Sequence, residues 1–216
     1  MATIGFIGSG NIGSTVARLA VAAGHDVVLS NSRGPDTLAD LVAELGPKAS
    51  AATSTEAAER GDIVVVTIPL RGYQDVPVAP LAGKIVIDTN NYYWQRDGHF
   101  AELDDESTTS AELLQAHLPQ SRVVKAFNHI QVLQLAADGQ SAGSENRRAL
   151  VISGADDGAK AEVTSLLDSF GYDVVDAGPL SEGWRFEPDH PAHGPRLTVA
   201  EMTTALAAAQ RRVRVG

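Results

Sequence analysis

Residues 3–13 read Thr-Ile-Gly-Phe-Ile-Gly-Ser-Gly-Asn-Ile-Gly. A short apolar run opens this stretch and ends at a glycine-rich turn with the pattern G-x-G-x-x-G over residues 8–13. Apolar residues then recur at helical spacing from Ile12 until Gly24. The stretch therefore predicts a strand, a tight turn and a helix in direct succession.

This order gives the glycine pattern a physical meaning. In a strand–turn–helix unit, Gly8 permits the tight turn, Gly10 lets a pyrophosphate approach the backbone, and Gly13 lets helix and strand pack closely. The start of the helix offers free N–H groups to the same anion. The alternative is a glycine turn that serves only to reverse the chain. The position between a strand and a helix favours a dinucleotide site.

The end of the second predicted strand indicates which dinucleotide is bound. Enzymes that use NAD, and FAD enzymes with the same turn, usually place Asp or Glu there to bind the ribose hydroxyls. Here residues 30–33 read Ser-Asn-Ser-Arg. An acid would repel a 2′-phosphate, whereas Asn31, Ser32 and Arg33 supply neutral and cationic donors for it. The sequence favours NADP, with a solvated loop arginine as the alternative for Arg33.

The rest of the chain alternates strand and helix patterns. Pro35 suits the first turn of a helix that continues to Leu45, and residues 53–56 and 109–112, each running from Thr to Glu, predict capping boxes. Further strands are predicted at residues 26–29, 49–52, 63–66, 85–88, 123–126, 149–152 and 174–175. Repeated βα units imply a mostly parallel sheet covered on both faces. We therefore predict an α/β, Rossmann-type doubly wound fold with a short C-terminal helical appendage, divided into an NADP-binding domain (1–180) and a terminal segment (181–216).

The terminal segment is predicted to hold a loop and one helix. Residues 181–195 carry Trp184 and three prolines, which indicates a loop of functional length. Thr198 and Glu201 predict a capping box. The helix that follows has an apolar stripe, which packs either on its own sheet or on a partner subunit. The stripe consists of Val199, Met202, Leu206, Ala209 and Val213.

Composition limits the classes of function. The 216 residues include no cysteine, which excludes disulfides and thiol nucleophiles. A formal net charge of -10 with only four lysines argues against nucleic acid as a partner. The chain has no apolar run long enough to span a membrane and no leader pattern, so we expect a cytoplasmic protein without a membrane partner.

The loops that follow the predicted strands at 63–66, 85–88 and 123–126 should border the nicotinamide. Ligands of such sheets lie at the carboxyl ends of the strands. In these loops Ile68 and Pro69 would form an apolar wall, although an ordinary strand end is an alternative. His129 follows a predicted strand and could exchange a proton; a packing histidine is the alternative. Residues 189–193, Asp-His-Pro-Ala-His, invite a metal site, but the proline and the lack of a further ligand argue against one, so no metal is expected.

Several stretches form a recognisable set: residues 4–13, 30–33, 66–69 and 123–128, and the segment Ala-Gly-Pro-Leu at 177–180. With the length and the element order, this set resembles the coenzyme F420-dependent NADP oxidoreductase family. The resemblance extends over nearly the whole chain. It implies a compact homodimer whose partners are small-molecule cofactors. It further implies hydride transfer between NADP and the deazaflavin coenzyme F420.

The resemblance also implies roles for individual residues. The pyrophosphate would lie on Gly8, Ser9, Gly10, Asn11, Ile12 and Gly13. The 2′-phosphate would be held by Asn31, Ser32 and Arg33. The reacting rings would lie at Ile68, Pro69, Asn128 and His129.

Two departures from the family leave other functions open. The turn at residues 31–33 carries fewer cations than the family's Ser-Arg-Arg type of turn. The segment at residues 184–196 is not familiar from the well-studied members, and it would lie where the second substrate enters. One alternative is an NADPH-dependent reductase of a small imine, carbonyl or flavin. Another is a non-catalytic dinucleotide sensor. For the acidic tail of a deazaflavin, candidate cations are Arg71, Lys125 and Arg185.

Overall fold

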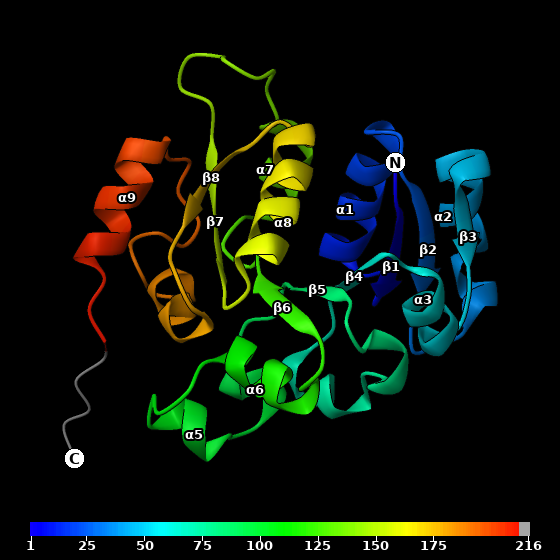
Figure 1. Cartoon of the computed structure of the whole chain (residues 1–216), viewed down its shortest axis with the longest axis horizontal. Helices are drawn as coiled ribbons and strands as arrows, with labels where there is room; N and C mark the ends of the chain where they lie inside the picture. Colours follow the sequence, from blue (N-terminus) through cyan, green and yellow to red (C-terminus); the bar gives the residue numbers. More distant parts are fainter. Residues whose placement is uncertain (212–216) are drawn as a thin grey trace.

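The computed structural model describes residues 1–211, and within them eight strands form one sheet in the order β3-β2-β1-β4-β5-β6-β7-β8 (Figure 1). The strands are β1 (Thr3–Ile7), β2 (Asp26–Ser30), β3 (Ala49–Ala51), β4 (Ile63–Val66), β5 (Ile85–Asp88), β6 (Arg122–Lys125), β7 (Ala149–Gly154) and β8 (Asp173–Asp176). The α-helices are α1 (Asn11–Ala22), α2 (Ala39–Leu45), α3 (Ser54–Arg60), α4 (Trp94–Asp97), α5 (Ala101–Asp104), α6 (Ser110–His117), α7 (Val132–Ala137), α8 (Asp157–Ser169) and α9 (Val199–Ala208). The 3-10 helices are η1 (Pro35–Leu38), η2 (Gly46–Lys48), η3 (Leu70–Asp75), η4 (Ala79–Leu81) and η5 (Leu180–Phe186).

The polarity of the sheet changes once. Strands β3 to β6 run parallel, β7 pairs antiparallel with β6, and β8 runs parallel to β7. The predicted α/β, Rossmann-type, mostly parallel sheet is thereby confirmed. Since β7 pairs with β6 through Ser153 and Gly154, its first residues extend beyond the carboxyl end of β6. They form a wall beside the site described below.

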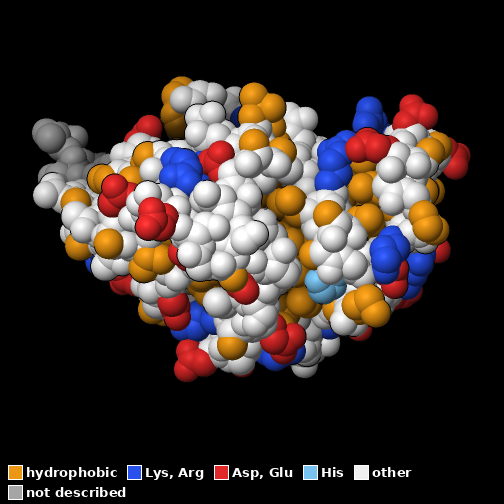
Figure 2. All heavy atoms as spheres, turned by 90° about the horizontal axis from the view of Figure 1, so that it is seen from above, with side chains coloured by type: hydrophobic (Ala, Val, Ile, Leu, Met, Phe, Trp, Pro, Cys, Tyr) orange, Lys and Arg blue, Asp and Glu red, His pale blue; other side chains and the backbone are white. Residues whose placement is uncertain are grey.

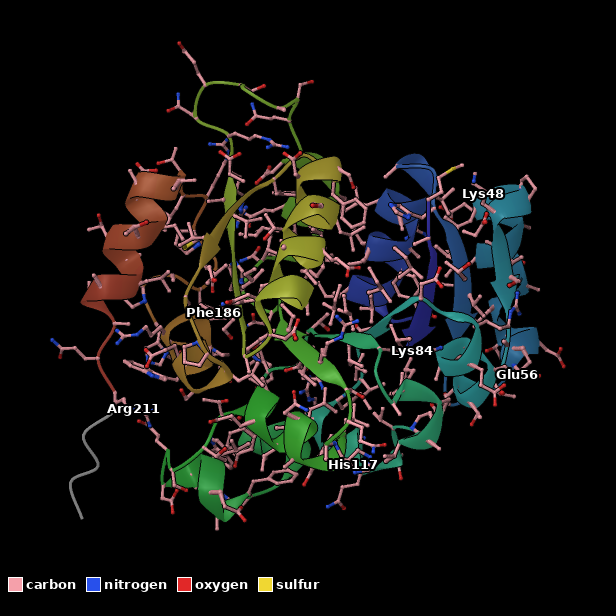
Figure 3. All side chains as sticks on the ribbon, viewed as in Figure 1. Lys48, Glu56, Lys84, His117, Phe186 and Arg211 are labelled. Atoms are coloured by element: carbon pink, nitrogen blue, oxygen red, sulfur yellow. The ribbon has the colours of Figure 1, made fainter. Side chains whose placement is uncertain are left out.

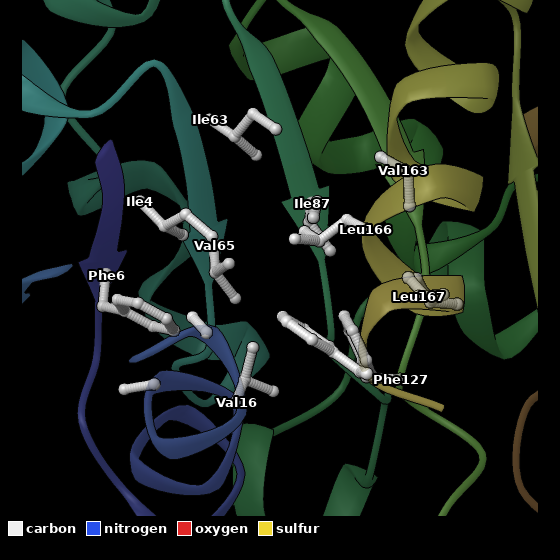
Figure 4. Close-up of a cluster of buried hydrophobic side chains, with 14 of the residues drawn as sticks. Ile4, Phe6, Val16, Ile63, Val65, Ile87, Phe127, Val163, Leu166 and Leu167 are labelled. Carbon is white, nitrogen blue, oxygen red and sulfur yellow. The ribbon is translucent and has the colours of Figure 1, made fainter. Parts of the chain in front are cut away.

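Both faces of the parallel strands are buried because successive side chains point to opposite sides. On one face, Ile4, Phe6, Ile63, Val65 and Ile87 meet side chains of α1 and α8 (Figure 4). On the other face, Val64, Val66 and Val86 meet side chains of α3 and α6. The two layers hold the carboxyl ends of the central strands at one edge.

The C-terminal segment packs on the same chain as far as it is described. Met202 and Leu206 of α9 and Phe186 of η5 form a third apolar cluster with Ala149 and Val151 of β7. Figure 3 shows Phe186 between η5 and the β7–β8 strands. Val213, the last residue of the predicted stripe, lies outside the described residues. The division of the chain at residue 180 stays a prediction.

Two short-range predictions need correction. Residues 181–195 were expected to be a loop throughout, but η5 covers Leu180–Phe186, because a 3-10 turn gives no 3.6-residue periodicity to detect. The helix expected from Pro35 begins as η1 and continues as α2. The capping boxes predicted at Thr53, Thr109 and Thr198 are all present.

The surface mixes side chains of both charge signs. On the face seen in Figure 2, acidic, basic and hydrophobic side chains lie interspersed. At the opposite ends of the parallel strands, Lys84 donates to the carbonyls of Ala58, Glu59 and Gly61 (2.7, 2.7 and 2.8 Å) and so closes the end of α3 (Figure 3). None of the helices within residues 1–211 is long and apolar enough to cross a bilayer.

Candidate active site

The glycine turn after β1 is shaped by steric demands at two of its glycines. Gly8 has φ +103°, and a Cβ there would lie 2.2 Å from the Thr67 carbonyl oxygen. A Cβ at Gly13 would lie 2.5 Å from the Gly8 carbonyl oxygen. At Gly10, by contrast, a Cβ would meet no atom of residues 1–211 within 4 Å. Gly8 and Gly13 thus serve the packing of the turn, whereas the surface over Gly10 is open to a ligand.

Helix α1 begins at this open surface with its amide groups uncapped. Gly10 is the N-cap, and in the part of the chain that the structure describes no side chain caps this helix end. The first intrahelical bond runs from Ser14 N to the Gly10 carbonyl (2.9 Å), so the earlier amides have no such partner. Free N–H groups and the positive end of the helix dipole form an anion site that suits a pyrophosphate.

The turn after β2 is pre-formed around Asn31. Its Oδ1 accepts from the Arg33 N–H (2.9 Å), and its Nδ2 donates to Thr37 Oγ1 (2.9 Å). Among the described residues, the exposed Arg33 guanidinium has no hydrogen-bond or ion-pair partner. The structure thus gives the Asn31 side chain a role in holding the turn and leaves the Arg33 side chain to meet an anion.

A cavity of about 460 Å³ joins these two turns. Its lining includes residues 8–10, 31–33 and 67–69, together with Arg71. The Arg71 guanidinium also donates to the Arg96 carbonyl (3.1 Å). The predicted pyrophosphate and 2′-phosphate residues are thus brought together in one concave surface, and contact with a nucleotide stays a prediction.

A second cavity, of about 590 Å³, begins where the first one ends. The two cavities share Gly10, Thr67, Ile68 and Pro69. The second continues over the carboxyl ends of β5 and β6 and reaches the loop before α9. Further lining residues are Asn11, Ile12, Thr89, Asn90, Asn91, Tyr93, Arg96, Phe127, Asn128, His129, Ile130, Gln131, His193 and Gly194.

The chain bends sharply into this second cavity after β6. Phe127 adopts φ +62°, a left-handed conformation that is rare for an aromatic residue, while its side chain is completely buried. Such a conformation persists only where the surroundings impose it, and it often marks a functional site. The bend brings Asn128 to the lining of the cavity.

The Asn128 carboxamide is held by neighbours from two other segments. Its Nδ2 donates to Asn91 Oδ1 (3.1 Å) and to the Phe186 carbonyl (3.0 Å). Asn91 Nδ2 in turn donates to the Asn128 carbonyl (2.7 Å). The loops after β5 and β6 and the end of η5 are therefore joined into one unit at the cavity.

His129 is a buried histidine whose ring nitrogens face protein atoms. Only 1% of it is exposed, its Nε2 accepts from the Val151 N–H (3.0 Å), and its Nδ1 lies 3.4 Å from Asn128 Oδ1. Burial lowers the pKa of His129 to about 3, and the positive groups around it act in the same direction. The ring is therefore neutral and joins β7 to the loop after β6; a part in catalysis stays a prediction.

A buried ion cluster lies beneath the same strand ends. The completely buried Lys125 ammonium contacts Asp88 Oδ2 (3.3 Å), Glu187 Oε1 (3.5 Å), Ser110 Oγ (2.8 Å) and the Asn90 carbonyl (2.8 Å). Burial raises the pKa of Asp88, and Lys125 opposes this shift. Lys125 is thus unavailable to a ligand's acidic tail and instead fixes the backbone of Asn90. Arg185 is also engaged, since it pairs with Glu182.

Asn90 provides a test of whether the cavity fits a ligand. Its side chain is 3% exposed, and neither its Nδ2 nor its Oδ1 has a partner in the part of the chain described. An unpaired buried amide costs about 1–3 kcal/mol. The NH2 group of a carboxamide such as that of nicotinamide would donate to Asn90 Oδ1, and its carbonyl oxygen would accept from Asn90 Nδ2. The open surface over Gly10 and this amide together fit a nicotinamide dinucleotide.

The position of His193 does not follow from its sequence neighbourhood. Its spacing from His190 suggests only a metal ligand, yet His193 borders the second cavity next to Gly194. Within residues 1–211 no group of three or more His, Asp or Glu side chains could hold a metal ion. The available signal was the histidine pair inside an unusually long segment, but only the folded chain places one member of that pair at the cavity.

Part of the sequence matches a known protein family. Residues 3–92 match the family described as NADP oxidoreductase, coenzyme F420-dependent, which confirms the resemblance for the segment from β1 to the loop after β5. Among curated proteins no similar sequence is found.

Several solved structures resemble the whole fold. A hypothetical protein from Sinorhizobium meliloti is 29% identical, with a TM-score of 0.78 and coverage of 91% of this chain and 95% of that one. A candidate F420-dependent NADP reductase from Arthrobacter sp. FB24 is 26% identical, with a TM-score of 0.73 and coverage of 85% and 87%. The 3-hydroxyisobutyrate dehydrogenase of Mycobacterium tuberculosis, 20% identical over 84% of this chain and 56% of that one (TM-score 0.60), shares the fold alone.

Proposed function

We propose that this chain, an NAD(P)-dependent oxidoreductase, transfers a hydride between NADP(H) and the deazaflavin coenzyme F420. One observation carries the proposal: the two cavities meet at Gly10 and residues 67–69. A dinucleotide lying along the first cavity would present its nicotinamide ring to the second. That arrangement is what transfer between two bound cofactors requires.

The first cavity would take the adenosine half of NADP(H). Arg33 would bind the 2′-phosphate, with Ser32 as a further donor. The pyrophosphate would lie over Gly10 and accept from the first amides of α1. The nicotinamide would rest on Ile68 and Pro69, and the unpaired Asn90 amide would bind its carboxamide.

The second cavity would take the deazaflavin. Its volume, about 590 Å³, lies within the range of small-molecule sites and suits a ring system whose tail projects out. Arg96 at its lining is the candidate for the acidic tail, with Arg71 close by. Hydride chemistry belongs to the two cofactors, so the protein would contribute alignment and exclusion of water. Asn128 would help to align the rings.

A second candidate function is reduction of a small imine, carbonyl or flavin by NADPH. It is favoured by the amide-rich lining of the second cavity, because Asn90, Asn91 and Asn128 suit a compact polar acceptor. It is also favoured by the ion pair between Arg96 and Asp97 (2.8 Å), which lowers the net positive charge available for an acidic tail.

Stopped-flow absorbance tests these proposals. The protein is mixed with NADPH and oxidised F420, with NADH and FMN as parallel comparisons. We expect rapid loss of the deazaflavin absorbance with NADPH and much slower loss with NADH. NADPH binding without bleaching would reject F420 and favour a small acceptor, and an absence of turnover with every acceptor would favour a dinucleotide sensor.

We also propose that the protein is a cytoplasmic homodimer whose ligands are small molecules, as the resemblance implies. Light scattering coupled to size-exclusion chromatography tests the dimer, and a mass equal to one chain would reject it.

A further inference from the structure

Two histidines border the second cavity, and their ring nitrogens have different surroundings. Both nitrogens of His129 face protein atoms, as described above. His193 lies on the segment between η5 and α9, and its Nδ1 lies 3.0 Å from the Phe186 carbonyl oxygen. The difference determines which ring can exchange a proton with a ligand.

The Phe186 contact fixes the tautomer of His193. A carbonyl oxygen only accepts hydrogen bonds, so Nδ1 carries the hydrogen and donates it to Phe186. In the neutral ring the lone pair is therefore on Nε2. Within residues 1–211 Nε2 has no hydrogen-bond partner, and His193 belongs to the lining of the cavity. The ring thus offers a proton acceptor that no protein group occupies.

The backbone around His193 is held from both sides. The Gly194 N–H donates to the His129 carbonyl (2.8 Å). The completely buried Arg148 donates from Nη2 to the carbonyls of Gly194 and Pro195 (3.1 and 3.2 Å), while its Nη1 pairs with Asp138 (2.7 Å). A ring carried by so constrained a backbone has a defined position, as proton transfer requires.

Charges around His193 leave it neutral near pH 7. Burial lowers the pKa of His193, and the positive charge of Lys125 acts in the same direction. The hydrogen bond to Phe186 and the carboxylates of Glu187 and Asp189 oppose this shift. The neighbouring His129 is itself neutral. The net result is a ring that is neutral at pH 7, which is the form that can accept a proton.

We propose that His193, through Nε2, exchanges the proton that accompanies hydride transfer at the second substrate. This inference rests on the proposed function. When reduced F420 is oxidised, the C5–H bond breaks and its electron pair passes with the hydrogen to C4 of the nicotinamide. The N1–H bond of the deazaflavin also breaks, and its proton forms a bond with His193 Nε2. The deazaflavin is oxidised by two electrons and NADP⁺ is reduced by two; the reverse direction returns the proton from His193 to N1.

The assignment predicts opposite pH profiles for the two directions. Reduction of NADP⁺ needs neutral His193, so its kcat/KM falls as the pH drops below the lowered pKa of this histidine. Reduction of F420 needs the protonated ring, so its kcat/KM rises over the same interval. His193→Gln should abolish the pH dependence in both directions and lower kcat/KM about 100-fold. A decrease of this size is typical for loss of a general acid or base.

The experiment compares wild type, His193→Gln and the matched control His190→Gln from pH 5 to pH 8, in both directions. His190 is a suitable control because it lies in the same segment and its Nδ1 faces the Glu187 and Pro188 carbonyls. We expect the control to keep the wild-type profile and His193→Gln to lose the pH limbs while binding NADPH normally. In His193→Ala, added imidazole should restore part of the rate.

A second readout is independent of turnover. Long-range ¹H–¹⁵N NMR reports which ring nitrogen carries the hydrogen, and we expect the Nδ1–H form of His193 at pH 7.5. A wild type that never transfers hydride to F420 would overturn the proposed function and this inference with it. An active wild type whose pH profile survives in His193→Gln, or a His193 with hydrogen on Nε2, would overturn the inference alone.

Discussion

At the scale of single residues, the three glycines of the turn after β1 are needed for different reasons. Gly8 and Gly13 have protein atoms where a Cβ would lie, whereas Gly10 faces open space. Steric exclusion by the fold and access for a ligand are therefore separable at neighbouring positions. Two substitutions to alanine distinguish them.

Gly13→Ala should destabilise the protein, and Gly10→Ala should not. The added methyl at residue 13 would press on the Gly8 carbonyl, at a cost of about 1–3 kcal/mol. At residue 10 the methyl meets no protein atom but occupies the surface assigned to the pyrophosphate. Urea denaturation and NADPH fluorescence titration measure the two effects. A Gly10→Ala protein with undiminished NADPH affinity would contradict the location of the pyrophosphate.

Arg33 is the residue to which we assign the 2′-phosphate of NADP(H). Arg33→Ala should weaken NADPH binding about tenfold or more, since a hydrogen bond to a charged group contributes about 1.5–3 kcal/mol. NADH lacks the 2′-phosphate, so its binding should hardly change. Arg33→Lys keeps the charge without the planar fork and should give an intermediate loss. Equal losses for NADPH and NADH would reject the 2′-phosphate assignment.

At the scale of elements, similar capping boxes differ in what lies around them. Thr53 caps α3 at the surface, whereas the Thr109 side chain that caps α6 is buried. Thr109 Oγ1 also donates to the Leu180 carbonyl at the start of η5 (3.1 Å). The cap of α6 is therefore also a tie between two segments that are remote in sequence.

Thr109→Ala should cost more stability than Thr53→Ala. Loss of the cap alone should lower the free energy of unfolding by about 1 kcal/mol in Thr53→Ala. Loss of the cap together with the buried bond to Leu180 should lower it by about 2–3 kcal/mol in Thr109→Ala. Urea denaturation of the two variants gives the comparison. Similar losses in both would mean that the Leu180 bond adds nothing to stability.

At the scale of the whole molecule, the buried His129 links stability to pH. Its pKa is about 3 in the folded protein against 6.5 in a model compound, so below pH 6.5 the unfolded chain binds a proton that the folded chain does not. This contribution to stability is present above pH 6.5 and is lost as the pH falls toward 3. At pH 5 the loss should be about 2 kcal/mol.

His129→Gln should reduce this acid sensitivity. The glutamine oxygen can accept from the Val151 N–H in place of Nε2, and it does not titrate in this range. The free energy of unfolding of the variant should therefore fall less than that of the wild type between pH 6.5 and pH 5, in urea titrations at each pH. Equal slopes would show that His129 is not the group responsible.

The sequence by itself determined the features that depend on near neighbours. The apolar runs specified the strands, Thr and Glu three residues apart specified the caps, and the spacing of Gly8, Gly10 and Gly13 specified the turn between β1 and α1. The lack of an acid at residues 30–33 favoured NADP. Such signals can be recognised because each depends on local backbone geometry or on charge within a few residues.

Only the tertiary structure decided which polar side chains face the cavity. From its place after a strand, His129 was the candidate for proton exchange. However, β7 runs antiparallel past the end of β6, and the Val151 N–H donates to His129 Nε2. Lys125 looked available to a ligand, but Asp88 and Glu187 surround it. His193, 64 positions after His129, reaches the cavity instead. These outcomes depend on contacts between segments far apart in the chain, and local spacing does not encode them because they arise only when the sheet is assembled.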